Sequence, residues 1–137
     1  MLTNEEKAYI AGIIDGEGSI MLTSFHSNEL HSPCVSIAST TLELLQWIKD
    51  KTNTGVIKRK KNYNTERHKD CFSYTLRYND AINFLEMISP YLVIESKKRR
   101  ALMIINEYKS LTPRNGRYSE ELLEKKRKFY ERFIALK

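Results

Sequence analysis

The sequence is poor in cysteine, histidine and long apolar runs, and each shortage excludes a class of protein. Two cysteines and three histidines in 137 residues make no disulfide framework, and their spacing fits no zinc motif. No stretch approaches the roughly 18 apolar residues that a membrane-spanning helix needs. The first six residues are acidic and hold no secretory apolar run. We therefore expect an intracellular protein, in the cytoplasm or an organelle matrix, with no membrane partner.

Positive charge is in excess. Lysine and arginine number 23 against 17 acidic residues, which gives a net charge of +6. The hydrophobic content of 41% is ordinary for a soluble domain with one core. A polyanion is therefore a candidate partner. Charge alone leaves open the alternative of a merely basic soluble protein.

One stretch, residues 9–20, organises the chain. An apolar helix runs into two carboxylates, Asp15 and Glu17, and a glycine follows each of them. The C-terminal end of a helix already carries about half a negative charge, so acidic residues are unfavourable there. A bound cation is the simplest explanation for this pattern. The glycines, Gly16 and Gly18, predict a sharp turn of the backbone after the helix.

The rest of the chain alternates between helical and extended patterns. Thr3 and Glu6 form a capping-box pattern that predicts a first helix over residues 4–15. Strands are expected over 19–25, 34–39, 56–61 and 71–78, and further helices over 41–55, 81–89, 97–108 and 119–136. Gly55 is expected to end the second helix, and Asn79 or Asp80 to cap the third. This order predicts an α+β domain with a four-stranded antiparallel sheet and helices on one face.

Small residues recur at helical spacing in the first helix. Ala8, Ala11 and Gly12 would let a second helix approach closely. The alternative is that this face packs inside its own domain.

The nine residues 10–18, Ile-Ala-Gly-Ile-Ile-Asp-Gly-Glu-Gly, closely resemble the signature of the LAGLIDADG homing endonucleases. The order of elements also resembles that family's core, from about Asn4 to Lys109. The resemblance implies an α-β-β-α-β-β-α core with a saddle-shaped sheet over residues 1–111. Residues 112–137 are then a basic amphipathic helical extension of the same domain. The activity implied is that of an intron-encoded, site-specific double-stranded DNA endonuclease.

The resemblance also implies roles for individual residues. Glu17 stands at the signature's eighth position and would bind the catalytic Mg²⁺, or another divalent cation such as Mn²⁺, together with the backbone carbonyl of Gly16. Asp15 stands at the sixth position, which supports a helix end or the seam between two helices. The family usually places a lysine at the start of the helix after the fourth strand. Lys97 is our first choice and Lys98 the second, the alternative being a solvated or phosphate-contacting basic run.

The signature occurs once in this chain. Two strand breaks need two carboxylate sets, so the resemblance implies a homodimer on a long, near-palindromic target. The dimer seam would contain Ala8, Ala11, Gly12 and Asp15.

The polar face of the sheet is the expected DNA-binding surface. Strand alternation assigns to it Ser19, Met21, Thr23, Lys58, Lys60, Ser73, Thr75 and Arg77. The alternative is an ordinary solvated sheet face.

A binding protein without cleavage is the competing hypothesis. Relatives often carry polar catalytic residues late in the second strand, whereas residues 37–40 here include no Gln or Arg. A maturase acting on host intron RNA, or a non-cleaving DNA-binding regulator, would keep the fold without cutting. A third alternative, a domain inserted in a larger protein, is disfavoured because the chain begins with Met and shows no splicing-junction chemistry.

Overall fold

The computed structural model describes residues 1–24, 30–64, 66–113 and 116–137. These residues form five α-helices and one four-stranded sheet, so the α+β class is confirmed. The helices are α1 (Asn4–Glu17), α2 (Leu42–Thr52), α3 (Asn79–Ile88), α4 (Glu95–Met103) and α5 (Glu120–Ile134). The strands are β1 (Gly18–Thr23), β2 (Ser32–Ser39), β3 (Val56–Arg59) and β4 (Phe72–Arg77). Short helical turns are η1 (Ser89–Tyr91), η2 (Ile104–Tyr108) and η3 (Lys109–Leu111).

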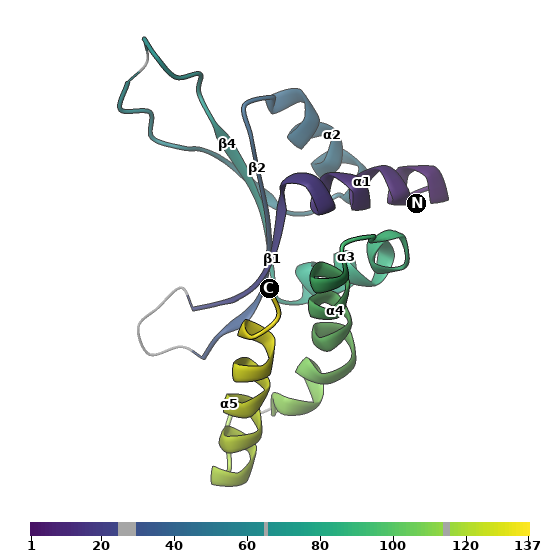
Figure 1. Ribbon diagram of the computed structural model, residues 1–137, viewed down its shortest axis with the longest axis vertical. Helices are drawn as coiled ribbons and strands as arrows, with labels where there is room; N and C mark the ends of the chain where they lie inside the picture. Colours follow the sequence, from purple (N-terminus) through teal and green to yellow (C-terminus); the bar gives the residue numbers. More distant parts are fainter. Residues whose placement is uncertain (25–29, 65, 114–115) are drawn as a thin grey trace.

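The sheet is antiparallel throughout, with the strand order β1-β2-β4-β3. Figure 1 shows α1 to α4 on one side of the sheet, which leaves the other side without a helical cover. On the covered side, Ile20, Val35 and Leu76 lie directly across from one another on β1, β2 and β4, and all three are buried. The strands therefore alternate between a core face and an outer face, as expected for a half-covered sheet.

The helices close the core with one apolar face each. The helical residues with no exposed surface include Ile10 and Ile14 on α1, Leu45 and Ile48 on α2, and Leu85 and Ile88 on α3. Phe129 and Phe133 of α5 belong to the same buried cluster. No helix among the described residues is long and apolar enough to cross a membrane.

A buried lysine holds α5 in place. Lys126 is 7% exposed, and its ammonium donates to the hydroxyls of Tyr118, Thr112 and Tyr108. All three ammonium protons have an oxygen partner, which is the condition for burying a lysine without a carboxylate. One lysine of the predicted basic amphipathic extension is therefore buried rather than exposed to solvent.

Two of the predicted helix boundaries are wrong. The second helix ends at Thr52, and its C-cap is Asn53 in the left-handed conformation with φ 57°, rather than Gly55. Gly55 has φ 97°, and a Cβ there would lie 2.3 Å from the ring of Tyr74 on β4, so a glycine at this position leaves room for that ring. Tyr78, with φ 53°, is the N-cap of α3, and no side chain caps that helix, so the predicted cap at Asn79 or Asp80 is absent.

The strands differ from their predicted bounds by a few residues. β1 begins one residue earlier than expected, and β2 begins two residues earlier, at Ser32. β3 ends at Arg59, and Lys60 follows it with its N–H donating to the Cys71 carbonyl at 2.8 Å. The predicted last residue of the first strand, Phe25, lies outside the described residues.

Candidate active site and sheet face

The last turn of α1 carries two carboxylates and no basic residue of its own. The helix continues past Asp15 through Gly16 to Glu17, two residues beyond the predicted end. Gly16 and Glu17 are both exposed. Because the carbonyl end of a helix carries about half a negative charge, the Glu17 carboxylate concentrates negative charge at a solvent-facing point. Such a point attracts a cation.

Lys97 of α4 supplies a cation to this helix end. Its Nζ donates to the carbonyl oxygens of Ile14 and Asp15, both at 2.8 Å. Lys97 therefore lies at the same end of α1 as Glu17, although backbone oxygens already occupy two of its three donors. Lys98, the second-choice lysine, is half-buried.

Asp15 holds the start of α4 in return. Its two carboxylate oxygens accept the N–H groups of Val93 at 2.9 Å and Ile94 at 3.1 Å. Ile94 is the N-cap of α4 and has no side chain able to cap it. Asp15 thus supports a helix end, but the end belongs to α4 rather than to its own helix. Its placement in a dimer seam stays a prediction.

Gly18 is required for close packing rather than for a sharp turn. Its backbone is extended, with φ −89° and ψ 162°, which any residue can adopt. A Cβ at Gly18 would lie 2.6 Å from Ile14 Cδ1 and 2.8 Å from Ile14 Cα. Gly16 has nothing within 4 Å of such a Cβ. The prediction that both glycines permit a sharp turn is therefore wrong.

The donor chemistry at this end fits a hard divalent cation only in part. The Glu17 carboxylate and the Gly16 carbonyl are oxygen donors of the kind that magnesium prefers. Among the described residues, however, no group of three or more His, Cys, Asp or Glu side chains could hold a metal. One chain thus offers a fraction of a coordination shell, and the remaining ligands have to come from water or another molecule.

The small residues of α1 do not all face the same way. Ala8 and Gly12 are exposed, and a Cβ at Gly12 would meet nothing within 4 Å. Ala11 has no exposed surface, since it is buried in the core beside Ile10 and Ile14. The prediction that Ala11 contacts a twin helix is therefore wrong, because its methyl group is covered within its own domain.

The outer face of the sheet begins where α1 ends. Ser19, Met21 and Thr23 alternate with the buried residues of β1, as the sequence pattern predicted. The register places Ser19 opposite Ser36, Ser36 opposite Thr75, and Thr75 opposite Val56. This row of short side chains crosses all four strands.

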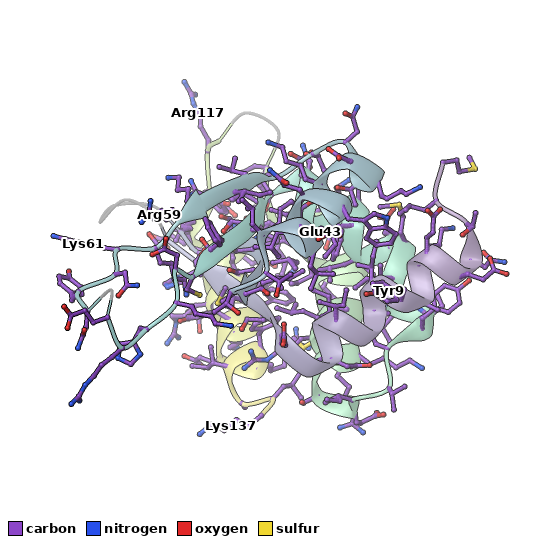
Figure 2. The ribbon with its side chains drawn as sticks, turned by 90° about the horizontal axis from the view of Figure 1, so that it is seen from above. Tyr9, Glu43, Arg59, Lys61, Arg117 and Lys137 are labelled. Carbon is purple, nitrogen blue, oxygen red and sulfur yellow. The ribbon has the colours of Figure 1, made fainter. Side chains whose placement is uncertain are left out.

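Basic residues gather toward the β3 end of this face. Lys58 lies opposite Ser73, and with Thr75 and Arg77 it lines a hollow of about 320 Å³ that Asp80 also borders. The structure thus brings together four of the residues predicted to bind DNA. Beyond β3 the chain extends away from the helices, as Figure 1 shows, and Figure 2 shows Lys61 projecting from this extension. The Asn62 side-chain amide in this extension donates to the His68 carbonyl at 2.8 Å.

Sequence reasoning missed the contribution of β2 to the outer face. Ser36 and Ala38 share the face with Ser19 and Ser73 through the strand register. Cys34 shares it too, opposite Met21 and Arg77, but it is only 3% exposed, and this burial raises the pKa of its thiol. The alternation within residues 34–39 was the available signal for Ser36 and Ala38.

Two exposed apolar residues beside Asp15 were also missed. Val93 is 83% exposed and Ile94 is 42% exposed. Both donate their backbone N–H groups to Asp15, so these two residues lie next to the C-terminal end of α1. The chain thus exposes apolar surface close to its acidic residues.

No protein-family model and no curated protein matches the sequence. Solved structures do match. The archaeal intron-encoded homing endonuclease I-Vdi141I, complexed with DNA, is 23% identical with a TM-score of 0.75, covering 98% of this chain and 85% of that one. The homing endonuclease I-CvuI, with DNA left uncleaved in the presence of magnesium, is 18% identical with a TM-score of 0.75, covering 97% and 82%. Another structure of I-CvuI with its target was obtained in the presence of calcium.

A longer protein matches as well. The LAGLIDADG meganuclease I-AabMI, bound to uncleaved DNA, is 20% identical with a TM-score of 0.62. The match covers 96% of this chain but only 43% of I-AabMI. These likenesses confirm the fold expected from the signature: the chain has the α+β fold of the LAGLIDADG homing endonucleases.

Proposed function

We propose that the chain is a divalent-metal-dependent, site-specific endonuclease that cleaves double-stranded DNA as a homodimer. The observation that carries this proposal is that the C-terminal end of α1 directly adjoins the outer face of the sheet. Glu17 ends α1, and Ser19, the first outward residue of β1, follows two positions later. A duplex laid against the outer face therefore has a phosphate group within reach of the carboxylate. The DNA held by I-Vdi141I and I-CvuI supports this reading.

The Glu17 carboxylate and the Gly16 carbonyl would hold the metal. A bound divalent cation activates water and neutralises charge at the scissile phosphate. The chain's own lysines add positive charge from α4: Lys97 lies at the helix end, and Lys98 follows it. Magnesium and calcium in the two I-CvuI structures favour a divalent cation of this class.

The homodimer follows from the single signature and the incomplete ligand set. A second copy meeting this one along Ala8 and Gly12 would bring two Glu17 carboxylates together near a twofold axis. Their mutual repulsion is relieved when a cation lies between them. That the match spans less than half of I-AabMI is consistent with this chain acting as one of two halves.

A non-cleaving DNA-binding protein or RNA maturase is the second candidate, and β2 favours it. Ile37 is buried, and the exposed neighbour on the outer face is Ala38, whose methyl group offers no chemistry. The strand next to the helix end therefore places no catalytic side chain at this position.

The decisive experiment is to incubate the protein with a library of duplex targets and magnesium, beside Glu17→Gln. We expect double-strand cutting at one site by the wild type, with a loss of at least about 100-fold in the variant. Duplex binding in calcium should persist in both, with log K falling with log salt at a slope near −5 if about six phosphates are contacted. Equal cutting by both proteins would exclude Glu17 as the metal ligand. Tight binding to structured RNA with no cutting of any duplex would favour the maturase.

The dimer is tested by Gly12→Leu. The new side chain has open space within its own chain, so the monomer should fold, whereas a twin helix could no longer approach. We expect sedimentation to show a dimer for the wild type and a monomer for the variant. Asn83→Leu, at an exposed position on α3, is the control and should remain dimeric. A dimeric Gly12→Leu would rule out this seam.

A further inference from the structure

The C-terminal end of α1 and the N-terminal end of α4 each lack a partner on their own helix, and each obtains one from the other helix. The last turn of α1 has no basic residue, and the N-cap of α4 has no side-chain cap. Lys97 of α4 binds the carbonyls of Ile14 and Asp15, while the Asp15 carboxylate binds the N–H groups of Val93 and Ile94. All four hydrogen bonds involve an ionised group, and such bonds are about twice as strong as neutral ones.

We propose that Lys97 is a positioning residue, and that together with Asp15 it forms a reciprocal clamp that fixes the end of α1 bearing Glu17. The Lys97 ammonium uses two of its three donors for backbone oxygens at 2.8 Å. Lys97 is also half-buried, so its side chain is held against the end of α1. Its action on the reaction then passes through the backbone of α1. The consequence for metal binding rests on the function proposed above, whereas the clamp itself does not.

The chemistry of the helix end explains why such a clamp is needed. The last carbonyls of α1 carry partial negative charge, and the carboxylates of Asp15 and Glu17 follow within the same turn. Without a cation these groups repel one another, and the end of the helix frays most easily. Lys97 offsets this repulsion at the Asp15 carbonyl, two residues before Glu17. By holding this turn, the clamp would also fix the backbone that carries the Gly16 carbonyl and the Glu17 carboxylate.

Hydrogen exchange tests the clamp without reference to metal or DNA. The Gly18 N–H donates to the Ile14 carbonyl and reports on the last turn of α1, and the Val93 and Ile94 N–H groups report on the start of α4. In Lys97→Met we expect all three amides to exchange faster, by about tenfold or more. Lys97→Arg, which keeps the charge and two donors, should restore most of the protection.

The control is Arg99→Met. It removes a cation from the same helix, where Arg99 pairs with Glu95 on an exposed surface. Exposed pairs contribute little, so the three amides should exchange at the wild-type rate. Wild-type exchange in Lys97→Met, or equal acceleration in Arg99→Met, would overturn the proposal. Asp15→Asn is a second variant, in which exchange should accelerate mainly at the Val93 and Ile94 amides, since these donate to Asp15.

Manganese titration tests the link to metal binding. In the ¹⁵N spectrum of the wild type, Mn²⁺ alone should broaden the Gly16 and Glu17 amides. Lys97→Met should require about fivefold more Mn²⁺ for the same broadening, because the two oxygens are no longer held in place. Unchanged Mn²⁺ affinity in Lys97→Met would overturn the positioning role. If the wild type shows no broadening while the exchange results hold, the clamp is supported and the proposed metal site is wrong.

Discussion

The two ends of α1 are held by different means. At the start of the helix, Thr3 accepts the Glu6 N–H at 3.1 Å and Glu6 accepts the Thr3 N–H at 2.9 Å, all within four residues. At the far end, the stabilising groups come from Lys97 and from Asp15 acting on α4, about 80 residues away. The first end can form as soon as the helix does, whereas the second forms only after α4 has docked. The candidate active site lies at the second end, so its geometry depends on the tertiary fold.

The largest effect is expected from Gly18→Ala at the far end of α1. The new methyl group would collide with the Cα of Ile14, which is backbone and cannot rotate away. We expect a loss of about 3 kcal/mol in the free energy of unfolding, measured by urea denaturation. Gly16→Ala is the control: it meets nothing within 4 Å, and inside a helix it should be neutral or stabilising by up to about 1 kcal/mol. Equal costs for the two variants would show that backbone freedom, not close packing, requires these glycines.

Asp15→Ala should have the next largest effect, because it leaves two backbone N–H groups of α4 without their acceptor. We expect a loss of about 2 kcal/mol in the free energy of unfolding, measured by urea denaturation. The double variant with Lys97→Met should cost less than the sum of the single variants, since both side chains belong to one network. Strict additivity would mean that the two halves of the clamp act independently.

Thr3→Ala removes the capping box at the N-terminus of α1. We expect it to lower the free energy of unfolding by about 1 kcal/mol, the usual value for an N-cap hydroxyl. Because the box lies far from Glu17 along the helix, exchange of the Gly18 amide should stay close to the wild-type rate in this variant. Faster exchange at Gly18 would show that the two ends of α1 are coupled. Thr3→Ser, which keeps the hydroxyl group, is the matched control.

The smallest expected effect is on the pH dependence of stability, through Glu6 at the N-terminus of α1. A hydrogen bond from Lys51, helped by the Thr3 N–H, lowers the pKa of Glu6 from 4.5 to about 2. A carboxyl group with a lowered pKa contributes stability that is present above its unfolded pKa. That contribution should therefore be complete above about pH 4.5 and should be lost as the pH falls toward 2. We expect the urea midpoint of Glu6→Gln to fall less steeply than that of the wild type in this window, and parallel curves would contradict this.

Much of the fold could be predicted from local patterns. The capping box of Thr3 and Glu6 lies within four residues, and the alternation in β1 and β4 depends only on the period of a strand. The helix boundaries at Asn53 and Tyr78 were not predicted; both residues have positive φ, which is rare for a side chain as bulky as tyrosine. The prediction for Ala11 was wrong because the small size of a residue indicates that a close contact exists, but not which neighbour makes it.

In the candidate site, too, some features could be predicted from local sequence and others could not. The signature placed Glu17 and Gly16 at a helix end, and composition placed lysines somewhere in residues 97–100. That Lys97 turns back onto the carbonyls of α1, and that Asp15 reaches the backbone of α4, follows only from the docking of two helices. Spacing of about 80 residues carries no geometric information in an unfolded chain.

By itself, the sequence determined the order of helices and strands, the excess positive charge and the presence of a carboxylate at the end of α1, because these depend on neighbouring residues and on composition. The tertiary structure alone decided which cation meets that helix end, which small residues remain exposed on α1, and how Ser19, Ser36 and Thr75 align across the sheet. The physical reason is that these contacts join groups far apart along the chain. Hydrophobic packing holds the helices and strands against one another, and hydrogen bonds, which act only at short range, depend on that arrangement.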